Sequence, residues 1–153
     1  MVSCRCKLFD SIFYSINKLD ENIEISLYYY PDVNNKDDTW YQLYAQKLAG
    51  GYKFYAKVYV QYTTNIGDML NIITKACIRL IALKSLDSED IKRITINYFS
   101  DWDLYLLLSE NNMPNDILKK IEECIELNNL EEKVYYFYNE YWLINNDESM
   151  YYS

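Results

Sequence analysis

The sequence predicts a single α+β domain whose mixed or antiparallel sheet of about four strands has helices packed mainly on one face. Three observations lead to this prediction. The chain of 153 residues is long enough for one hydrophobic core and too short for two comfortable domains. Half of its residues are hydrophobic and 25% are charged, as in globular proteins. Segments of helical and of alternating periodicity follow one another without repeat or linker, which favours helices layered on a sheet.

We assign residues 1–146 to this domain and residues 147–153 to an acidic, flexible tail. Within the domain, apolar residues recur at helical spacing from Leu8 to Leu19 and indicate an amphipathic first helix. Residues 23–30 are β-branched and aromatic and are followed by a proline, so we expect a strand there. The polar, acidic stretch 32–38 has the composition of a loop.

Residues 39–49 fit either a helix or a strand, because their aromatic side chains suit both. Gly50 and Gly51 close this segment. Residues 52–62 show the clearest alternation in the chain, with apolar and aromatic side chains on one face and lysine, tyrosine and glutamine on the other. We expect this segment to be a strand with one buried face.

A helix with its N-cap at Thr64 or Asn65 is expected to run to about Ser85, and its wide apolar stripe indicates a central position in the fold. Residues 91–99 alternate and predict a third strand. Residues 101–110 predict a short helix.

Pro114 is expected to open another helix, because proline suits the first turn of a helix. The last element, residues 133–144, is aromatic on both alternating faces and predicts a strand. Such a strand is either central in the sheet or exposed as a surface for a partner.

The net charge of −8 and the pI near 4.5 bear on the class of partner. A field of this sign repels phosphate backbones and anionic lipids and favours a partner protein with a basic surface. We therefore expect no direct binding of nucleic acid and no membrane association, and we leave open a homo-oligomer. The abundance of Asn, Ile, Lys and Tyr, all with A/T-rich codons, points to an AT-rich genome such as that of many viruses and mobile elements.

The most apolar stretch, residues 66–86, contains four charged side chains and is not expected to span a membrane. The opening ten residues lack the apolar core of a signal peptide. The four cysteines have neither zinc-site spacing nor a histidine beside them. We expect reduced thiols, a cytoplasmic location and no metal or other cofactor.

The chain contains no histidine, which removes the commonest general base and every Ser/His/Asp or Cys/His triad. With three glycines it also cannot form a phosphate-binding loop or a dinucleotide fingerprint. Carboxylates remain, and Asp101 and Asp103 are placed where two acids can hold a magnesium ion. The alternative reading is that they are acids in the first turn of a helix, which complement its dipole.

One face of the strand at 52–62 interleaves Lys53 and Lys57 with Tyr55 and Tyr59. Aromatic rings alternating with cations can stack single-stranded nucleic acid. An ordinary solvent-facing sheet surface also alternates these residue types, and the net negative charge opposes phosphate binding.

The 18 tyrosines and 3 tryptophans suggest a contact surface, since these side chains are enriched at protein interfaces. The alternative is that codon bias alone accounts for them. Three segments combine aromatic and acidic residues, and we predict partner binding by their members: Asp37, Asp38, Trp40 and Tyr41; Asp101, Trp102 and Asp103; and Glu140, Tyr141 and Trp142.

The leading hypothesis is a non-enzymatic, acidic, tyrosine-rich binding protein of a virus or mobile element that inhibits a host nucleic-acid-handling defence enzyme. In size, acidity and aromatic richness the chain is similar to small anti-CRISPR and antirestriction proteins, although no motif carries this likeness. Three alternatives stay open: an immunity or antitoxin protein that neutralises a toxin, a self-associating virion component, and a metal-dependent phosphoryl-transfer enzyme.

Overall fold

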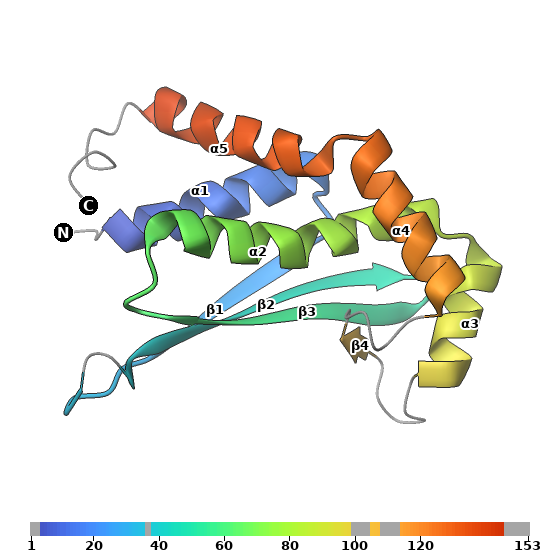
Figure 1. The fold of residues 1–153 in the computed structure, drawn as a ribbon, viewed down its shortest axis with the longest axis horizontal. Helices are drawn as coiled ribbons and strands as arrows, with labels where there is room; N and C mark the ends of the chain where they lie inside the picture. Colours follow the sequence, from blue (N-terminus) through green and yellow to red (C-terminus); the bar gives the residue numbers. More distant parts are fainter. Residues whose placement is uncertain (1–3, 36–37, 99–104, 108–113, 146–153) are drawn as a thin grey trace.

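The fold consists of a sheet and a layer of helices that covers one of its faces (Figure 1). The structure is a computed structural model and describes residues 4–35, 38–98, 105–107 and 114–145. In chain order its elements are α1 (Cys4–Leu19), β1 (Glu24–Tyr30), β2 (Trp40–Ala49), β3 (Tyr52–Gln61), α2 (Ile66–Ile81), the 3₁₀ turn η2 (Ala82–Ser85), α3 (Ser88–Tyr98), β4 (Tyr105–Leu107), α4 (Asn115–Leu127) and α5 (Leu130–Asn145).

The strands lie in the order β1-β2-β3-β4. The first three form an antiparallel meander, and the short β4 pairs in parallel with the start of β3. The predicted fold class is therefore confirmed: an α+β arrangement with helices on one face of a mixed sheet. Two of the predicted strands, however, are helices.

The hairpin between β2 and β3 is a two-residue turn, since Ala49 pairs directly with Tyr52. Its two central residues, Gly50 and Gly51, have φ angles of +59° and +84°. A turn with positive φ at both positions matches the right-handed twist of the strands and is strongly favoured by glycine. This turn fixes the register of β2 against β3.

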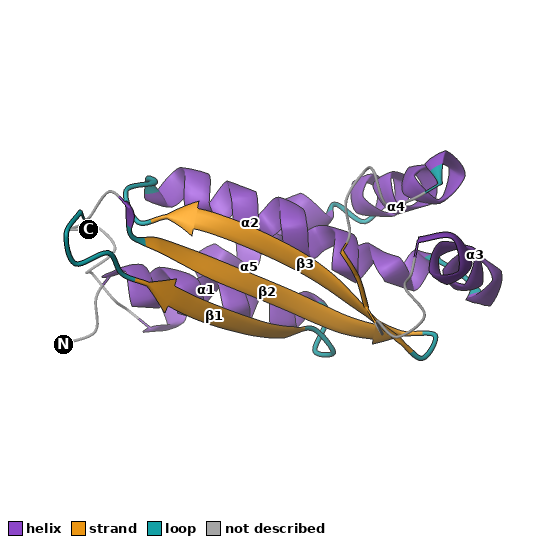
Figure 2. Cartoon of the chain, turned by 90° about the horizontal axis from the view of Figure 1, so that it is seen from below, coloured by secondary structure: helices purple, strands orange, loops and turns teal. Residues whose placement is uncertain are grey.

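The core lies between the sheet and helices α1, α2 and α5 (Figures 1 and 2). On β3 every second side chain is buried, from Phe54 to Val60. Helix α2 is as central as its stripe predicts, and Asn65 is its N-cap, whose side chain accepts a hydrogen bond from the backbone of Asp68. The largest fully buried side chains are Phe54, Leu8, Ile12, Ile16, Leu43, Met69, Ile73, Leu80, Ile81, Ile94, Ile117 and Ile121.

Of the ambiguous segment 39–49, Trp40–Ala49 form strand β2, the central strand of the meander. Leu43 and Ala45 alternate toward the helices and are buried. Pairing on both sides decides the conformation, because β2 contacts β1 and β3 along its length.

The prediction of a strand at 91–99 is wrong, because residues 88–98 form helix α3. A reciprocal cap starts this helix: the backbone N of Asp90 donates to Asp87 Oδ1 at 2.9 Å, and the backbone N of Asp87 donates to Asp90 Oδ2 at 3.3 Å. Ile91 and Ile94, three residues apart, are then both buried. The cap and this helical spacing prevail over the β preference of the isoleucines.

The prediction of a strand at 133–144 is also wrong, because this segment belongs to helix α5. Leu130, Val134 and Trp142 are buried at spacings of four and eight, which fit a helical face. A segment that is aromatic on both alternating faces carries little information about its period. The β propensity of the aromatic residues therefore gives the wrong prediction, and packing against α1 and α2 determines the helix.

The helix predicted after Pro114 is confirmed as α4, and the first helix is confirmed as α1. Of the short helix predicted at 101–110, the described residues 105–107 form β4 instead. The remainder of that segment and the proposed tail 147–153 lie outside the described residues.

Candidate functional site

The face of the sheet opposite the helices carries the candidate site, and Figure 2 shows this face in front of the helices. We call it the open face. Its residues follow from the strand alternation and the register. They are Glu24, Ser26, Tyr28 and Tyr30 on β1; Trp40, Gln42, Tyr44, Gln46 and Leu48 on β2; and Lys53, Tyr55, Lys57, Tyr59 and Gln61 on β3.

The register places these side chains in rows that cross the three strands. One row consists of Tyr28, Gln42 and Tyr59. The neighbouring row consists of Ser26, Tyr44 and Lys57. Directly opposed side chains in a sheet contact one another, so each row forms a unit of the surface.

Aromatic rings connect the rows into one network. The Tyr30 and Trp40 rings are stacked with centroids 4.4 Å apart and planes at 21°. Trp40 also contacts Tyr59, with centroids 5.1 Å apart. Tyr44 lies edge-on to Tyr28 at 5.9 Å and to Tyr55 at 6.0 Å. These offset and edge-to-face geometries are the favoured ones for aromatic pairs, so the rings hold one another in place.

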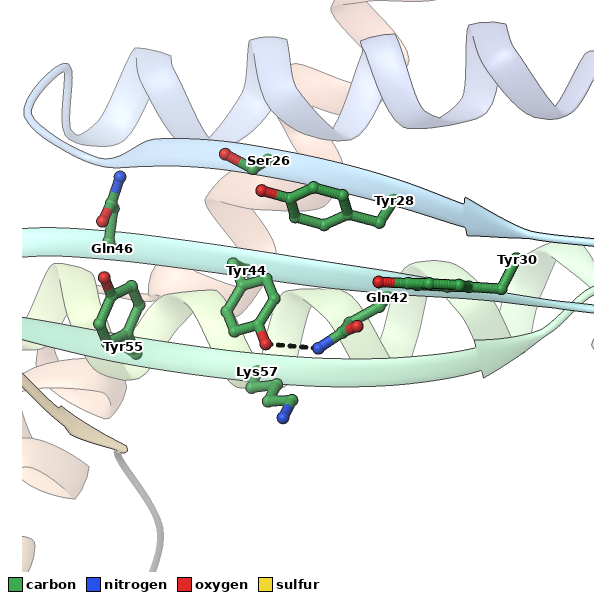
Figure 3. A pocket seen from close by; sticks show the side chains of 8 residues that line it. All are labelled: Ser26, Tyr28, Tyr30, Gln42, Tyr44, Gln46, Tyr55 and Lys57. Atoms are coloured by element: carbon green, nitrogen blue, oxygen red, sulfur yellow. Dashed lines mark hydrogen bonds between the residues drawn. The ribbon is translucent and has the colours of Figure 1, made fainter.

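A buried amide fixes the middle of this network. Gln42 is only 7% exposed although it projects from the open face. Its Nε2 donates to Tyr44 Oη at 2.5 Å (Figure 3). The same Nε2 lies 3.4 Å from Tyr59 Oη. Because one amide joins hydroxyls from β2 and β3, the rings around it have a defined orientation.

The rings surround a hollow of about 650 Å³ in the open face, with the side chains of Figure 3 along its walls. Its lining residues are Ser26, Tyr28, Tyr30, Gln42, Tyr44, Gln46, Tyr55 and Lys57. The lining thus combines planar apolar rings with hydroxyl, amide and ammonium groups. Such a mixture suits binding by contact and hydrogen bonding.

The electrostatics of the open face differ from those of the whole chain. The Lys57 Nζ lies 4.9 Å from the centroid of Tyr59 and 5.5 Å from that of Tyr44. Hydrogen bonding to Tyr59 raises the pKa of Lys57 above its usual value, so it stays a cation at neutral pH. The carboxylate of Glu24 accepts a hydrogen bond from Gln46 Nε2 at 2.8 Å. With Lys53 and Lys57 against Glu24, the open face is slightly positive on a chain of net charge −8.

The first predicted acidic and aromatic cluster is divided between surfaces. Trp40 lies on the open face, whereas Tyr41 projects toward the helices and its ring lies 4.9 Å from that of Phe9. Asp38 is exposed in the loop before β2, and Asp37 lies outside the described residues.

The other two clusters do not extend the open face within the described residues. Asp101, Trp102 and Asp103 lie outside those residues. Glu140, Tyr141 and Trp142 belong to α5 in the helical layer, where Trp142 is 5% exposed. The Tyr141 ring lies 5.6 Å from that of Tyr14 on α1. Partner binding by these residues stays a prediction.

Lys53, Tyr55, Lys57 and Tyr59 share one face of β3, as the sequence predicts, and this face forms part of the open face. The sequence reasoning missed the contributions of β1 and β2, notably Tyr28, Tyr30, Gln42 and Tyr44. The two glycines between residues 49 and 52 are the signal that gives the register of β2 on β3 and brings Gln42 beside Tyr59.

Within the part of the chain that the structure describes, no three His, Cys, Asp or Glu side chains lie close enough to hold a metal ion together. None of the helices described there has both the length and the apolarity needed to cross a membrane. No protein-family model matches the chain, and neither the curated proteins nor the solved structures include a significant match.

Proposed function

We propose that the protein is a non-enzymatic binding protein and that the open face of its sheet contacts the partner. One observation carries this proposal: six aromatic rings lie on a face that no described element covers. They are Tyr28, Tyr30, Trp40, Tyr44, Tyr55 and Tyr59. An extended aromatic surface of this kind is typical of interaction sites.

A partner protein fits this surface best. Tyrosine and tryptophan provide large, stiff contact areas and are enriched among the residues that dominate binding energies. Tyr28 and Tyr59 are 49% and 55% exposed, so much of their ring area is still available for burial. The nearly neutral charge of the open face favours close apolar contact, since few charges need to be desolvated.

The lining of the hollow supports binding in preference to catalysis. Its side chains are those of Tyr, Gln, Ser and Lys. A general base works best with a pKa near the operating pH, and the pKa of Lys57 is raised away from it. The chain contains no histidine to take this role.

The finer form of the proposal concerns the partner's identity. We propose a nucleic-acid-handling defence enzyme of a host, inhibited by this protein of a virus or mobile element. The net charge of −8 supports it, because such enzymes have basic surfaces for phosphates. This acidic charge lies away from the open face: α4 and α5 contribute seven carboxylates against three lysines, and they support long-range steering of a basic partner, not contact with it.

A second candidate is binding of single-stranded nucleic acid on the same face. The observation that favours it is the alternation of Lys53 and Lys57 with Tyr55 and Tyr59 on β3. The small number of cations makes it the weaker candidate, since phosphate contacts dominate such affinities.

The test compares two exposed tyrosines on opposite layers. Tagged wild-type protein, Tyr59→Ala and Tyr136→Ala are used to capture partners from lysate of cells that natively express the protein. Tyr59 is 55% exposed on the open face and Tyr136 is 66% exposed on α5. We expect Tyr59→Ala to reduce recovery of the partner at least tenfold and Tyr136→Ala to leave it unchanged.

Equal recovery by wild type and Tyr59→Ala would refute the open face as the binding surface. Loss of the partner at high salt supports a basic partner. Binding of a fluorescent twenty-nucleotide DNA or RNA by wild type, lost in Tyr59→Ala, would favour the second candidate.

A further inference from the structure

The edge of the sheet at β1 is the feature from which we infer how a partner docks. We infer that an extended segment of the partner protein adds to β1 as an additional strand and places alternate side chains on the open face. This inference rests on the proposed function, since it names the mode of binding at that same surface.

The backbone of β1 provides a free edge. Among the described residues, β1 pairs with β2 alone. All seven of its residues pair one-to-one with β2, from Glu24 opposite Gln46 to Tyr30 opposite Trp40, so the strand contains no bulge. The N–H and C=O groups of alternate residues therefore point away from β2, and no strand of the described part of the chain pairs with them.

Proteins usually protect such an edge with lysine, proline, a bulge or a covering element. Between its ends β1 has none of the first three. Its only charged residue is Glu24 at the start, and Pro31 follows its end. A regular edge of seven residues without these three protections is suited to strand addition.

The side chains along the edge point to the same conclusion. Tyr28, Tyr29 and Tyr30 are 49%, 54% and 41% exposed. They alternate between the two faces of the sheet, so an added strand would meet tyrosine on both sides. Ser26, the smallest residue of the hollow, leaves space for one larger side chain from the added strand.

Charge selects the kind of segment. Glu21 and Glu24 are both exposed and line a depression at the start of β1 together with Lys47 and Lys53. Lys47 is paired with Asp20, and Lys53 lies on β3, two strands away from the β1 edge. The other end of β1 carries the three tyrosines. The segment that fits has a basic residue beside Glu21 and Glu24, a bulky apolar residue beside Tyr28 and Tyr30, and no proline between them.

A second copy of the chain fits the edge less well. Helix α1 lies behind β1 in the view of Figure 2, and Phe13, Ile25 and Leu27 pack against the core there. Paired strands lie about 4.8 Å apart, whereas packed helices need about 8–10 Å between axes. Two copies joined through β1 would bring their α1 helices too close together, but an extended segment carries no helix.

The test uses a phage-displayed library of random twelve-residue peptides selected against the whole protein. Enriched peptides are synthesised and their affinities measured by fluorescence polarisation for wild type, Tyr29→Lys, Tyr59→Ala and Tyr136→Lys. Tyr29 lies on the edge but not on the open face, whereas Tyr59 lies on the open face two strands away. We expect both to weaken binding at least tenfold and Tyr136→Lys to leave it unchanged, with thermal melts checking that each variant is folded.

Loss of binding in Tyr59→Ala alone overturns the strand-addition inference and leaves the proposed function standing. Loss in Tyr29→Lys alone supports the edge and contradicts the open face. Unchanged affinity in both variants overturns the strand-addition inference and the proposed function together. Hydrogen exchange measures the added strand directly, and it should show new protection at alternate amides of β1 when the peptide binds. Protection of the same amides in a homodimer without peptide would overturn the inference.

Discussion

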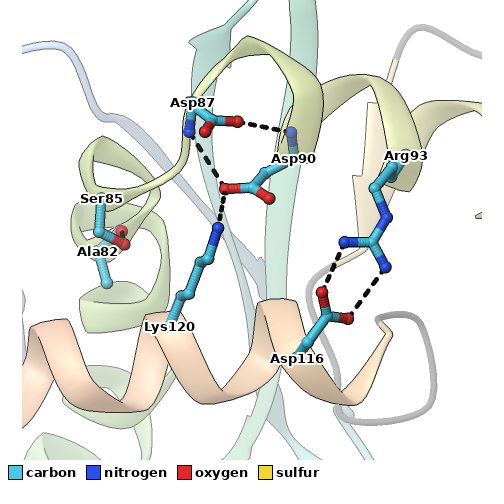
Figure 4. A network of polar contacts seen from close by, with 7 residues as sticks. All are labelled: Ala82, Ser85, Asp87, Asp90, Arg93, Asp116 and Lys120. Carbon is cyan, nitrogen blue, oxygen red and sulfur yellow. Dashed lines mark hydrogen bonds and ion pairs between the residues drawn. The ribbon is translucent and has the colours of Figure 1, made fainter.

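The open face of the sheet and the junction of α3 with α4 are both rich in polar groups, but they are built in different ways. At the junction, charged groups are paired across the two helices (Figure 4). Lys120 Nζ lies 2.8 Å from the buried carboxylate of Asp90, and Arg93 donates to both carboxylate oxygens of Asp116 through its two terminal guanidinium nitrogens. On the open face, neutral hydroxyls and one amide orient rings whose surfaces remain exposed.

This difference separates stability from recognition. Ion pairs and a cap at the α3–α4 junction satisfy one another and join two helices, so their removal affects folding. The open face keeps large apolar area in contact with water, which contributes to binding when a partner covers it. Substitutions at the junction should therefore lower mainly the free energy of unfolding, and substitutions on the open face should weaken mainly binding. Three predictions test this separation.

The largest effect is expected at the turn between β2 and β3, where the sheet contacts α3. A Cβ at Gly50 would lie 2.8 Å from Ile91 Cγ2 on α3, whereas a Cβ at Gly51 would meet nothing within 4 Å. Gly50→Ala adds a steric clash of about 1–3 kcal/mol to about 1–2 kcal/mol for the left-handed φ, and Gly51→Ala adds the latter alone. Urea unfolding should show Gly50→Ala as the less stable variant, and equal stabilities would contradict the close contact with α3.

The sequence predicts the parts of the fold where local signals agree. Residues 52–62 alternate strictly and Asn65 is a good N-cap, and both predictions hold. At 91–99 the isoleucines favour a strand, but the reciprocal bonds between Asp87 and Asp90 favour a helix. The helix at 133–144 depends on packing against α1 and α2, which is not contained in the local pattern.

The candidate site is predictable only in part for the same reason. Lys57 and Tyr59 belong to one alternating segment, so their common face follows from local periodicity. Tyr28 reaches them through the pairing of three strands, and the register of β1 on β2 depends on contacts across a long loop. Gln42 shows no local sign of burial, since its neighbours in space come from two other strands.

An intermediate effect is expected from the amide at the centre of the open face. Gln42→Ala removes the hydrogen bond to Tyr44 and frees the surrounding rings to reorient, so we expect partner or peptide binding to weaken about tenfold. The free energy of unfolding should fall by only about 1 kcal/mol, the usual value of one hydrogen bond. Asn145→Ala is the matched control, because the Asn145 amide also donates one hydrogen bond, to Tyr141 O at 2.7 Å, but lies on α5 away from the open face. Isothermal titration calorimetry and urea unfolding measure the two quantities.

A larger effect of Gln42→Ala on stability than on binding would break the separation between the two regions. It would mean that the ring network contributes mainly to folding.

The smallest effect is expected from acid titration of the α3–α4 junction. Hydrogen bonding to Lys120 lowers the pKa of Asp90 below its ordinary value of 3.8, and hydrogen bonding to Arg93 lowers that of Asp116 in the same direction. A carboxyl with a lowered pKa in the folded state stabilises the fold above pH 3.8 and loses this contribution as the pH falls through the folded value. Urea unfolding at pH 7, 5 and 3 should show a constant contribution from these groups at the first two values and a loss at the third.

Asp90→Asn should reduce the loss of stability between pH 5 and pH 3, because the variant has no carboxyl to protonate at this site. Asp116→Asn should reduce it less, since the Asp116 side chain is 57% exposed and that of Asp90 is 6% exposed. Binding to the open face measured at pH 7 should be the same in both variants. A change in binding there would show that the junction and the open face are coupled, in which case charge pairs on the helices contribute to recognition on the sheet.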